Sequence, residues 1–201
     1  MAQEIDEVLE FWFGGLSVEG LSTSEKSGRW FAKDAGFDRE IGERFGALHA
    51  AVASRRHEAW LESAPGSLAY ILVLDQFARN MFRGDPKMFA ADAQALEAAR
   101  HAIREGFDHM LVGQARIFMY MPFMHAESLA AQDQGVSLFR EFRSEVGEGA
   151  LGDAVQYSLD YMLAHERIVA RFKRFPHRNA VLGRQSTDEE RDFLAQPGSS
   201  F

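Results

Sequence analysis

The stretch Leu68-Ala-Tyr-Ile-Leu-Val-Leu-Asp-Gln-Phe-Ala-Arg-Asn-Met81 determines the fold that we predict from this sequence. On a helical wheel its apolar side chains cover every side, and a helix that is apolar all round belongs in the centre of a protein. Pro65 and Gly66 break the preceding pattern, and Ser67 is a residue type that caps helix starts. We therefore predict a buried central helix that begins at Ser67 and is surrounded by other helices.

Helical patterns also flank this segment on both sides. Apolar residues recur at the 3–4 spacing of an α-helix, and no β-branched run bounded by hairpin signals indicates a strand. We expect an all-α fold of antiparallel helical hairpins with no sheet. The flanking predicted helices cover residues 3–13, 38–61 in two pieces, about 90–105, about 112–147 with Pro122 as a start or a kink, 151–173 and 186–196.

Three local features refine this outline. Asp38 is a plausible N-cap, and Ser186-Thr-Asp-Glu189 matches the Ser-x-x-Glu capping box. The aromatic pair Trp30-Phe31 is expected to lie in the core. We assign residues 1–196 to a single all-helical domain and residues 197–201 to a flexible C-terminal tail.

Composition excludes several classes of protein. With 46% apolar residues the chain can build a real core, and without cysteine it has no disulfide framework or thiolate metal site. The N-terminus is acidic, unlike a signal peptide, and the longest apolar stretch, 117–129, is shorter than the ~20 residues of a membrane span. A net charge of −8 argues against binding to nucleic acid. We expect a cytoplasmic protein with no nucleic-acid or membrane partner.

Polar residues occupy apolar places on three of the predicted helices. Asp75 and Arg79 lie about 40° apart on the wheel, on a buried face of the central helix. His125 and His165 also face inward. Buried charges are usually paired, and a lone inward histidine is more often a hydrogen-bonded core residue than a ligand. The alternative is one cavity lined by all four side chains, where a histidine could act as an acid or base.

A metal site is not expected from these residues. His125 and Glu127 point about 200° apart on a helix, unlike an i, i+4 pair that can share an ion. The other ligand types, Asp75, Asp92, His165 and His177, show no spacing typical of helical zinc or di-iron sites. We assign neither a metal nor a cofactor.

The stretch 165–184 is unusually basic for an acidic chain. Arg167, Arg171 and Arg174 lie about 180–240° from His165 on the wheel, so we expect them on a solvated or salt-bridged face. After Pro176 the helix cannot continue. The turn that follows, residues 177–184, is therefore free to fold back over the domain, and its planar arginine side chains suit a carboxylate or a phosphate.

Several strings in the chain resemble the bacterial family known as domain of unknown function 924. The strings are Val8-Leu-Glu-Phe-Trp-Phe-Gly14, Leu74-Asp-Gln-Phe-Ala-Arg-Asn80, Phe118-Met-Tyr-Met-Pro-Phe-Met-His-Ala-Glu127, Arg174-Phe-Pro-His-Arg-Asn179 and Leu182-Gly-Arg184. The chain departs from the family pattern at Ala78, where proline is more usual. The resemblance implies an all-helical, tetratricopeptide-like fold and no established activity. The motif positions it marks as a possible ligand-binding set are Asp75, Arg79, Asn80, Arg83, His125, Glu127, His165, Arg174, His177, Arg178 and Asn179.

Three functions fit these residues. The first is a helical binding domain whose polar cavity holds a small anionic ligand or a peptide carboxylate. The second is an enzyme, a hydrolase or lyase, with His125 or His165 as general base and Asp75 orienting it; no nucleophile motif such as Gly-x-Ser-x-Gly is present. The third is an interaction scaffold that docks an acidic protein partner on the arginine face. The sequence indicates no oligomeric state, and we expect binding rather than catalysis.

Overall fold

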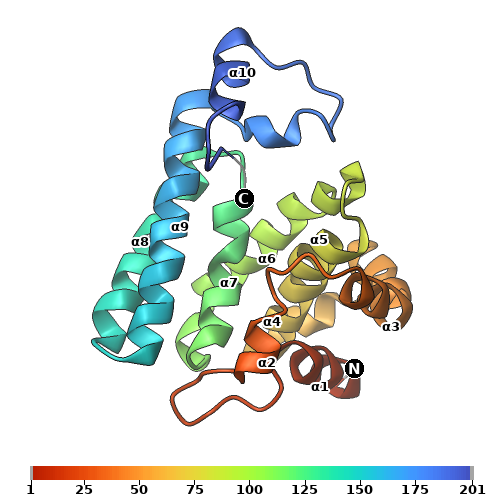
Figure 1. Cartoon of the computed structure of the whole chain (residues 1–201). Helices are drawn as coiled ribbons and strands as arrows, with labels where there is room; N and C mark the ends of the chain where they lie inside the picture. Colours follow the sequence, from red (N-terminus) through yellow and green to blue (C-terminus); the bar gives the residue numbers. More distant parts are fainter. Residues whose placement is uncertain (1, 200–201) are drawn as a thin grey trace.

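The computed structural model describes residues 2–199, and within that range it is built from helices and turns without a strand (Figure 1). The prediction of an all-α fold is confirmed. The closer likeness to tetratricopeptide arrays stays a prediction. The helices are α1 (Ala2–Phe13), α2 (Ser24–Ser27), α3 (Ala35–Ala53), α4 (Ala64–Leu72), α5 (Ala78–Met81), α6 (Asp92–Arg104), α7 (Gln114–His125), α8 (Leu129–Val146), α9 (Ala150–Phe172) and α10 (Asp188–Leu194).

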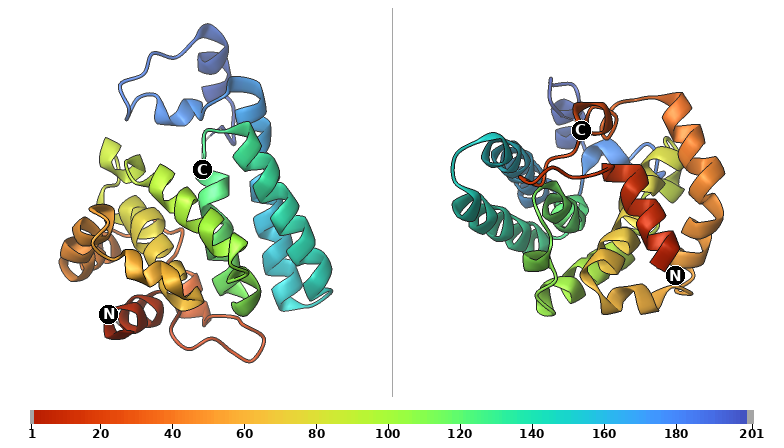
Figure 2. Two further views of the ribbon diagram at one scale, coloured as in Figure 1. Left: turned by 180° about the vertical axis from the view of Figure 1, so that it is seen from behind. Right: turned by 90° about the horizontal axis from the view of Figure 1, so that it is seen from below.

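The predicted central helix is confirmed, as α4 continued by α5. Every residue from 66 to 78 is buried, because α1, α3, α6 and α7 pack around this helix (Figure 2). Aromatic side chains fill the space between α1 and the centre: the ring centroid of Trp12 lies 5.6 Å from that of Phe77 and 5.5 Å from that of Phe118. The apolar surface of residues 68–81 is thus covered on all sides.

A π turn, Val73–Phe77, joins α4 to α5 without interrupting the helix. Such a turn holds one residue more than a regular α-helical turn and often marks a functional site. Asp75 sits in its middle and is fully buried. The turn therefore presents a carboxylate to the interior from the most buried element of the fold.

Four local predictions are wrong. Ser63, not Ser67, caps α4, because Pro65 is tolerated in the first helical turn and the helix starts before it. Asp34, not Asp38, caps α3. The capping box is formed by Thr187 and Glu190, one residue later than predicted. Phe31 is 64% exposed, whereas its neighbour Trp30 is buried as expected.

Pro122 lies inside α7 and neither starts nor ends it. The pattern that we extended to residue 147 is broken after His125 instead, and three residues later Ser128 caps the separate helix α8. Helix α7 is buried along nearly its whole length, because α4 and α6 cover one side and α8 and α9 cover the other. Among residues 2–199, no helix has the length and apolarity that crossing a membrane requires.

The α8–α9 hairpin depends on a close approach at Gly135. A Cβ atom there would lie 2.8 Å from Met162 Sδ and 2.9 Å from Phe123 Cβ. We expect Gly135→Ala to lower the free energy of unfolding by about 1–3 kcal/mol in urea denaturation, because the methyl group overpacks the interface. As a control, a Cβ at Gly46 on α3 meets nothing within 4 Å. Gly46→Ala should stabilise the protein by about 0.5–1 kcal/mol, and an unchanged Gly135→Ala protein would contradict the close approach.

Residues 173–199 form a separate layer on the end of α9 (Figure 1). Lys173 ends that helix in the left-handed conformation, and a small apolar cluster centred on Val169 and Phe175 holds the segment down. In the predicted tail, Ser199 Oγ donates a hydrogen bond to the carbonyl oxygen of Leu194 at 3.1 Å. Residues 200 and 201 of that tail lie outside the described residues.

Candidate functional site

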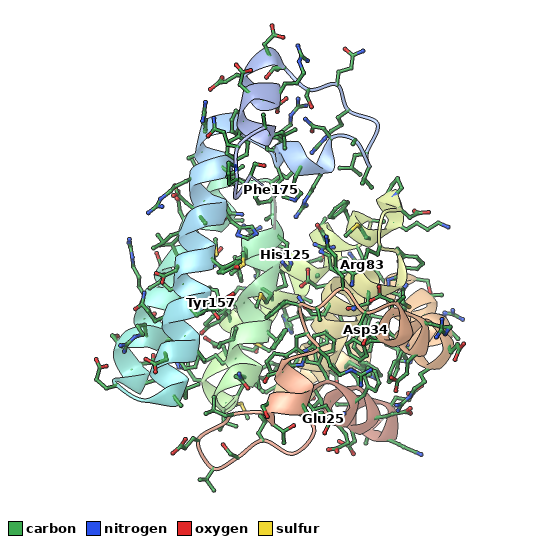
Figure 3. The ribbon with its side chains drawn as sticks, viewed as in Figure 1. Glu25, Asp34, Arg83, His125, Tyr157 and Phe175 are labelled. Atoms are coloured by element: carbon green, nitrogen blue, oxygen red, sulfur yellow. The ribbon has the colours of Figure 1, made fainter. Side chains whose placement is uncertain are left out.

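A pocket of about 400 Å³ lies where three parts of the chain meet. Its wall is formed by the start of α6 with the turn before it, by the C-terminal end of α7, and by the turn after Pro176. Figure 3 shows His125 at the end of α7 and Phe175 above it, on the side of the C-terminal layer that faces His125. The polar side chains in the wall are His125, Asp92, Glu127, Ser128 and Arg178.

Asp75 holds His125 from behind. The distance between Asp75 Oδ1 and His125 Nδ1 is 2.6 Å, and the amide nitrogen of Gln76 donates to the other carboxylate oxygen at 2.6 Å. Burial of Asp75 raises its pKa, but the charges and hydrogen bonds of His125, Arg79 and Gln76 together outweigh burial and hold the pKa at about 2. Asp75 is therefore ionised at neutral pH, so Nδ1 of His125 carries the proton that the carboxylate accepts.

Two guanidinium groups converge on the carboxylate of Asp92 at the pocket wall. Arg79 Nη2 lies 2.8 Å from Asp92 Oδ1, and Arg178 Nη1 lies 3.1 Å from Oδ2. Arg79 also lies 3.5 Å from Asp75, as the wheel predicted, and donates to the carbonyl oxygen of Met88. Burial raises the pKa of Asp92 against the pull of both arginines.

Arg178 is enclosed between two aromatic rings. Its guanidinium carbon lies 4.4 Å from the ring centroid of Phe89 and 4.5 Å from that of Phe175. The side chain is 6% exposed, and its Nε is buried without a hydrogen-bond partner among residues 2–199. Burial lowers the pKa of Arg178 to about 10, although Asp92 opposes the shift. A cation held in this way is under-coordinated, since an unmet buried donor costs free energy.

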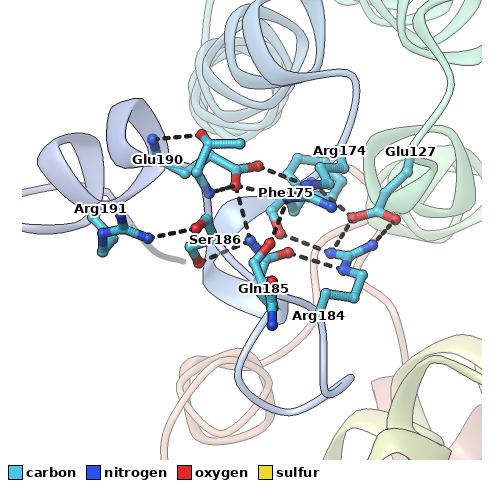
Figure 4. A network of polar contacts seen from close by, with 10 residues as sticks. Glu127, Arg174, Phe175, Arg184, Gln185, Ser186, Glu190 and Arg191 are labelled. Atoms are coloured by element: carbon cyan, nitrogen blue, oxygen red, sulfur yellow. Dashed lines mark hydrogen bonds and ion pairs between the residues drawn. The ribbon is translucent and has the colours of Figure 1, made fainter.

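A bidentate ion pair positions the turn that carries Arg178. Arg184 Nη1 and Nη2 donate to the two carboxylate oxygens of Glu127 at 2.6 and 2.8 Å, and the backbone N–H of Phe175 donates to the same carboxylate at 2.7 Å (Figure 4). Burial raises the pKa of Glu127, but these donors outweigh it and lower the pKa. Glu127 is thus a structural anchor as well as a pocket residue.

Two further histidines lie behind the wall. The ring of His165 is 6.4 Å from that of His125, and its Nδ1 is 2.8 Å from the carbonyl oxygen of Tyr161. The inward orientation predicted for His165 is confirmed, since it is 5% exposed. Burial lowers the pKa of His165 to about 3 and that of His177 to about 4. Both are neutral at pH 7.

The other predicted site residues lie elsewhere. Asn80 and Arg83 both bind Asp38 on α3, with the Arg83 Nε to Asp38 distance at 2.7 Å. Arg174 and Asn179 bind Glu190 of α10 instead (Figure 4). These four side chains stabilise contacts between elements and do not line the pocket.

Sequence reasoning missed two residues of the pocket wall, Asp92 and Phe89, and the ring of Phe175 that packs on Arg178. For Asp92 the sequence offered only the interpretation of a metal ligand type. No spacing links Asp92 to Arg178, which is 86 residues away. Within residues 2–199, no three His, Asp or Glu side chains gather closely enough to hold a metal ion.

Comparison with known proteins places the whole chain in one group. A family model described as a bacterial protein of unknown function, DUF924, matches residues 8–198. A solved structure, a protein of unknown function from Agrobacterium tumefaciens, is similar with a TM-score of 0.79 and 39% identity, over 96% of this chain and 98% of that chain. No functionally curated protein matches the chain. The resemblance seen in the sequence motifs is confirmed, and the chain belongs to the DUF924 family of bacterial proteins of unknown function.

Proposed function

We propose that the protein binds a small carboxylate-bearing molecule in the pocket between α6, α7 and the turn after Pro176. The observation that carries the proposal is Arg178, which is buried in the pocket wall, enclosed by Phe89 and Phe175, and left with an unpaired Nε–H. Arginine in this setting is suited to planar anions, because its donors are fixed in a fork and its faces are already covered.

The size of the pocket supports a metabolite rather than a macromolecule. Small-molecule sites commonly occupy about 300–1,000 Å³ and combine apolar walls with a few converging polar groups. This pocket has about 400 Å³, and Phe89, Leu96 and Leu182 supply apolar wall around the polar groups. A molecule with a carboxylate and a short apolar body matches both kinds of surface.

The contacts of Asp92 indicate which chemical group these arginines bind, namely a carboxylate. Arg79 and Arg178 both contact it, at 2.8 and 3.1 Å. The carboxylate of a ligand in the pocket would add to this arrangement by accepting hydrogen bonds from the guanidinium group of Arg178, whose side chain lines the wall. Ser128, which also lines the pocket, offers a hydroxyl group.

The competing scaffold hypothesis gains less support. Two of the three arginines on the proposed docking face already form ion pairs within the chain: Arg171 binds Glu189 at 2.8 Å, and Arg174 binds Glu190 at 2.6 Å. An acidic partner would have to compete with these contacts. We therefore do not propose protein docking as the function.

Isothermal titration with acetate, succinate and citrate tests the binding proposal. We expect one of these carboxylates to bind, and Arg178→Lys to weaken it by about tenfold or more, because lysine lacks the Nε–H and the planar fork. Arg167→Lys is the matched control, since Arg167 is exposed on α9 and outside the pocket wall. Binding that is absent, or that Arg178→Lys leaves unchanged, would exclude this function.

A further inference from the structure

We propose that His125 is the general base of a hydrolytic reaction in this pocket, and that the substrate is a small ester bearing a free carboxylate. The inference rests on the proposed function, because the carboxylate is what places the ester in the pocket. It adds a chemical step to binding. The step depends on the hydrogen bond between Asp75 and His125 and on the position of His125 in the pocket wall.

The orientation of His125 suits a base. Because Nδ1 is held by the Asp75 carboxylate at 2.6 Å, the ring is fixed in one tautomer and Nε2 is the nitrogen available for proton transfer. Asp75 itself is completely buried in the π turn, and both Gln76 and Arg79 fix its carboxylate. Asp75 is therefore a positioning residue, since it acts only through the imidazole.

The structure distinguishes His125 from the other histidines near the pocket. His165 is turned to the backbone of its own helix, with Nδ1 2.8 Å from Tyr161 O, and does not line the pocket. Burial lowers the pKa of His165 to about 3, which makes it a weak base at neutral pH. Of the two general bases that the sequence left open, His125 is the one that the geometry favours.

Water is the nucleophile that this chain can activate. The chain has no cysteine, and the hydroxyl of the pocket residue Ser128 accepts a hydrogen bond from Ala131 N as the cap of α8. In the proposed step, a water proton passes to His125 Nε2 while the water oxygen forms a bond to the acyl carbon. The carbonyl electron pair moves onto the carbonyl oxygen.

The tetrahedral intermediate formed in this way then breaks down to the products. The carbonyl bond re-forms, the bond from the acyl carbon to the ester oxygen breaks, and the proton held by His125 goes to the departing oxygen. One ester and one water become one acid and one alcohol, with no oxidant or reductant.

The charge balance around His125 supports the first step. Ionisable groups from every element packed against His125 surround it. His165 and His177 are neutral. The charged groups are three carboxylates and three guanidinium groups, namely Asp75, Asp92, Glu127, Arg79, Arg178 and Arg184. These six charges cancel. The carboxylate of a substrate adds one negative charge, which favours the protonated imidazole that the first step forms.

Hydrolysis of 4-nitrophenyl hydrogen succinate, followed by release of 4-nitrophenol, tests the inference. We expect turnover above the uncatalysed rate, and a decrease in kcat/KM of about 100-fold or more in His125→Gln, as general bases typically contribute. His109→Gln is the control, because that side chain is 57% exposed and outside the pocket. Asp75→Asn should change the pH profile of kcat/KM as well as its maximum, since the imidazole loses the carboxylate partner that fixes its tautomer.

A second measurement keeps the test decisive if His125→Gln folds poorly. Diethyl pyrocarbonate acylates neutral imidazoles, so mass spectrometry of the wild-type protein should find His125 modified and protected by succinate. Succinate binding without ester turnover, or turnover that survives His125→Gln, overturns the inference and leaves the binding proposal standing. Failure of all three test carboxylates to bind overturns the proposed function itself. Ester hydrolysis that is lost in Ser128→Ala and kept in His125→Gln would overturn the assignment of His125 as the base.

Discussion

Asp75→Asn is expected to lower the free energy of unfolding by about 3–5 kcal/mol, because it removes one partner of a buried ionic cluster. The amide has the shape of the carboxylate, so the change creates no cavity. What it removes is the charge that His125 and Arg79 contact at 2.6 and 3.5 Å in a place without solvent. Urea denaturation should show a lower midpoint with an unchanged slope, which indicates a change in stability alone.

The matched control for this loss is Asp188→Asn. Asp188 forms an ion pair with Arg191 on the surface of α10, and its side chain is 93% exposed. Exposed pairs contribute about 0–1 kcal/mol, so the same chemical change should barely move the midpoint. If both variants unfolded at the same urea concentration, the buried cluster would have no special part in stability.

Acidification is expected to destabilise the protein through His165, in a window that begins near pH 6.5. Burial lowers the pKa of His165 to about 3, while an unfolded chain has the ordinary value of about 6.5. At pH 7 both states are neutral. As the pH falls below 6.5, His165 becomes protonated in the unfolded chain but stays neutral in the folded protein. The free energy of unfolding therefore decreases until about pH 3. At pH 4.5 the loss amounts to about 3 kcal/mol.

Urea denaturation at pH 7.0 and 4.5 measures this dependence. His165→Gln cannot titrate and should show a loss between the two pH values that is smaller by about 3 kcal/mol than in the wild type. His109→Gln, at an exposed position, should keep the wild-type difference. Parallel behaviour of wild type and His165→Gln would mean that His165 accepts a proton without unfolding. His177, whose pKa burial lowers to about 4, acts in the same direction.

Periodicity was sufficient to predict the helices of this fold. The apolar residues of 68–81 occur on all sides of the wheel, and such a pattern is satisfied only at the centre of the molecule. The exact starts of the helices could not be predicted as well, because several residues near each start are able to cap the helix. Ser63 and Ser67 are the same residue type, and the sequence does not say that the proline between them is inside the first turn.

The polar site was predicted only as far as single helices allow. A wheel places Asp75 beside Arg79, and it turns His165 inward, because both statements concern residues on one helix. Contacts between elements do not follow from any wheel. The pairing of Asp92 with Arg178 depends on how the turn after Pro176 folds back over α6. The same fold of the chain decides which of the predicted site residues reach the pocket and which, like Arg174, bind elsewhere.

The π turn at Val73–Phe77 also determines which changes in chain length this protein tolerates. A loop usually absorbs the loss of one residue, whereas a helix turns by about 100° for each residue removed. Because a π turn accommodates one extra residue, deleting any one residue between 73 and 77 would convert the bulge to regular α-helix while α4 and α5 kept their orientation. The backbone around Asp75 would change, since Asp75 lies in the middle of the turn. A one-residue deletion at this point should therefore preserve the core and displace the carboxylate that contacts His125.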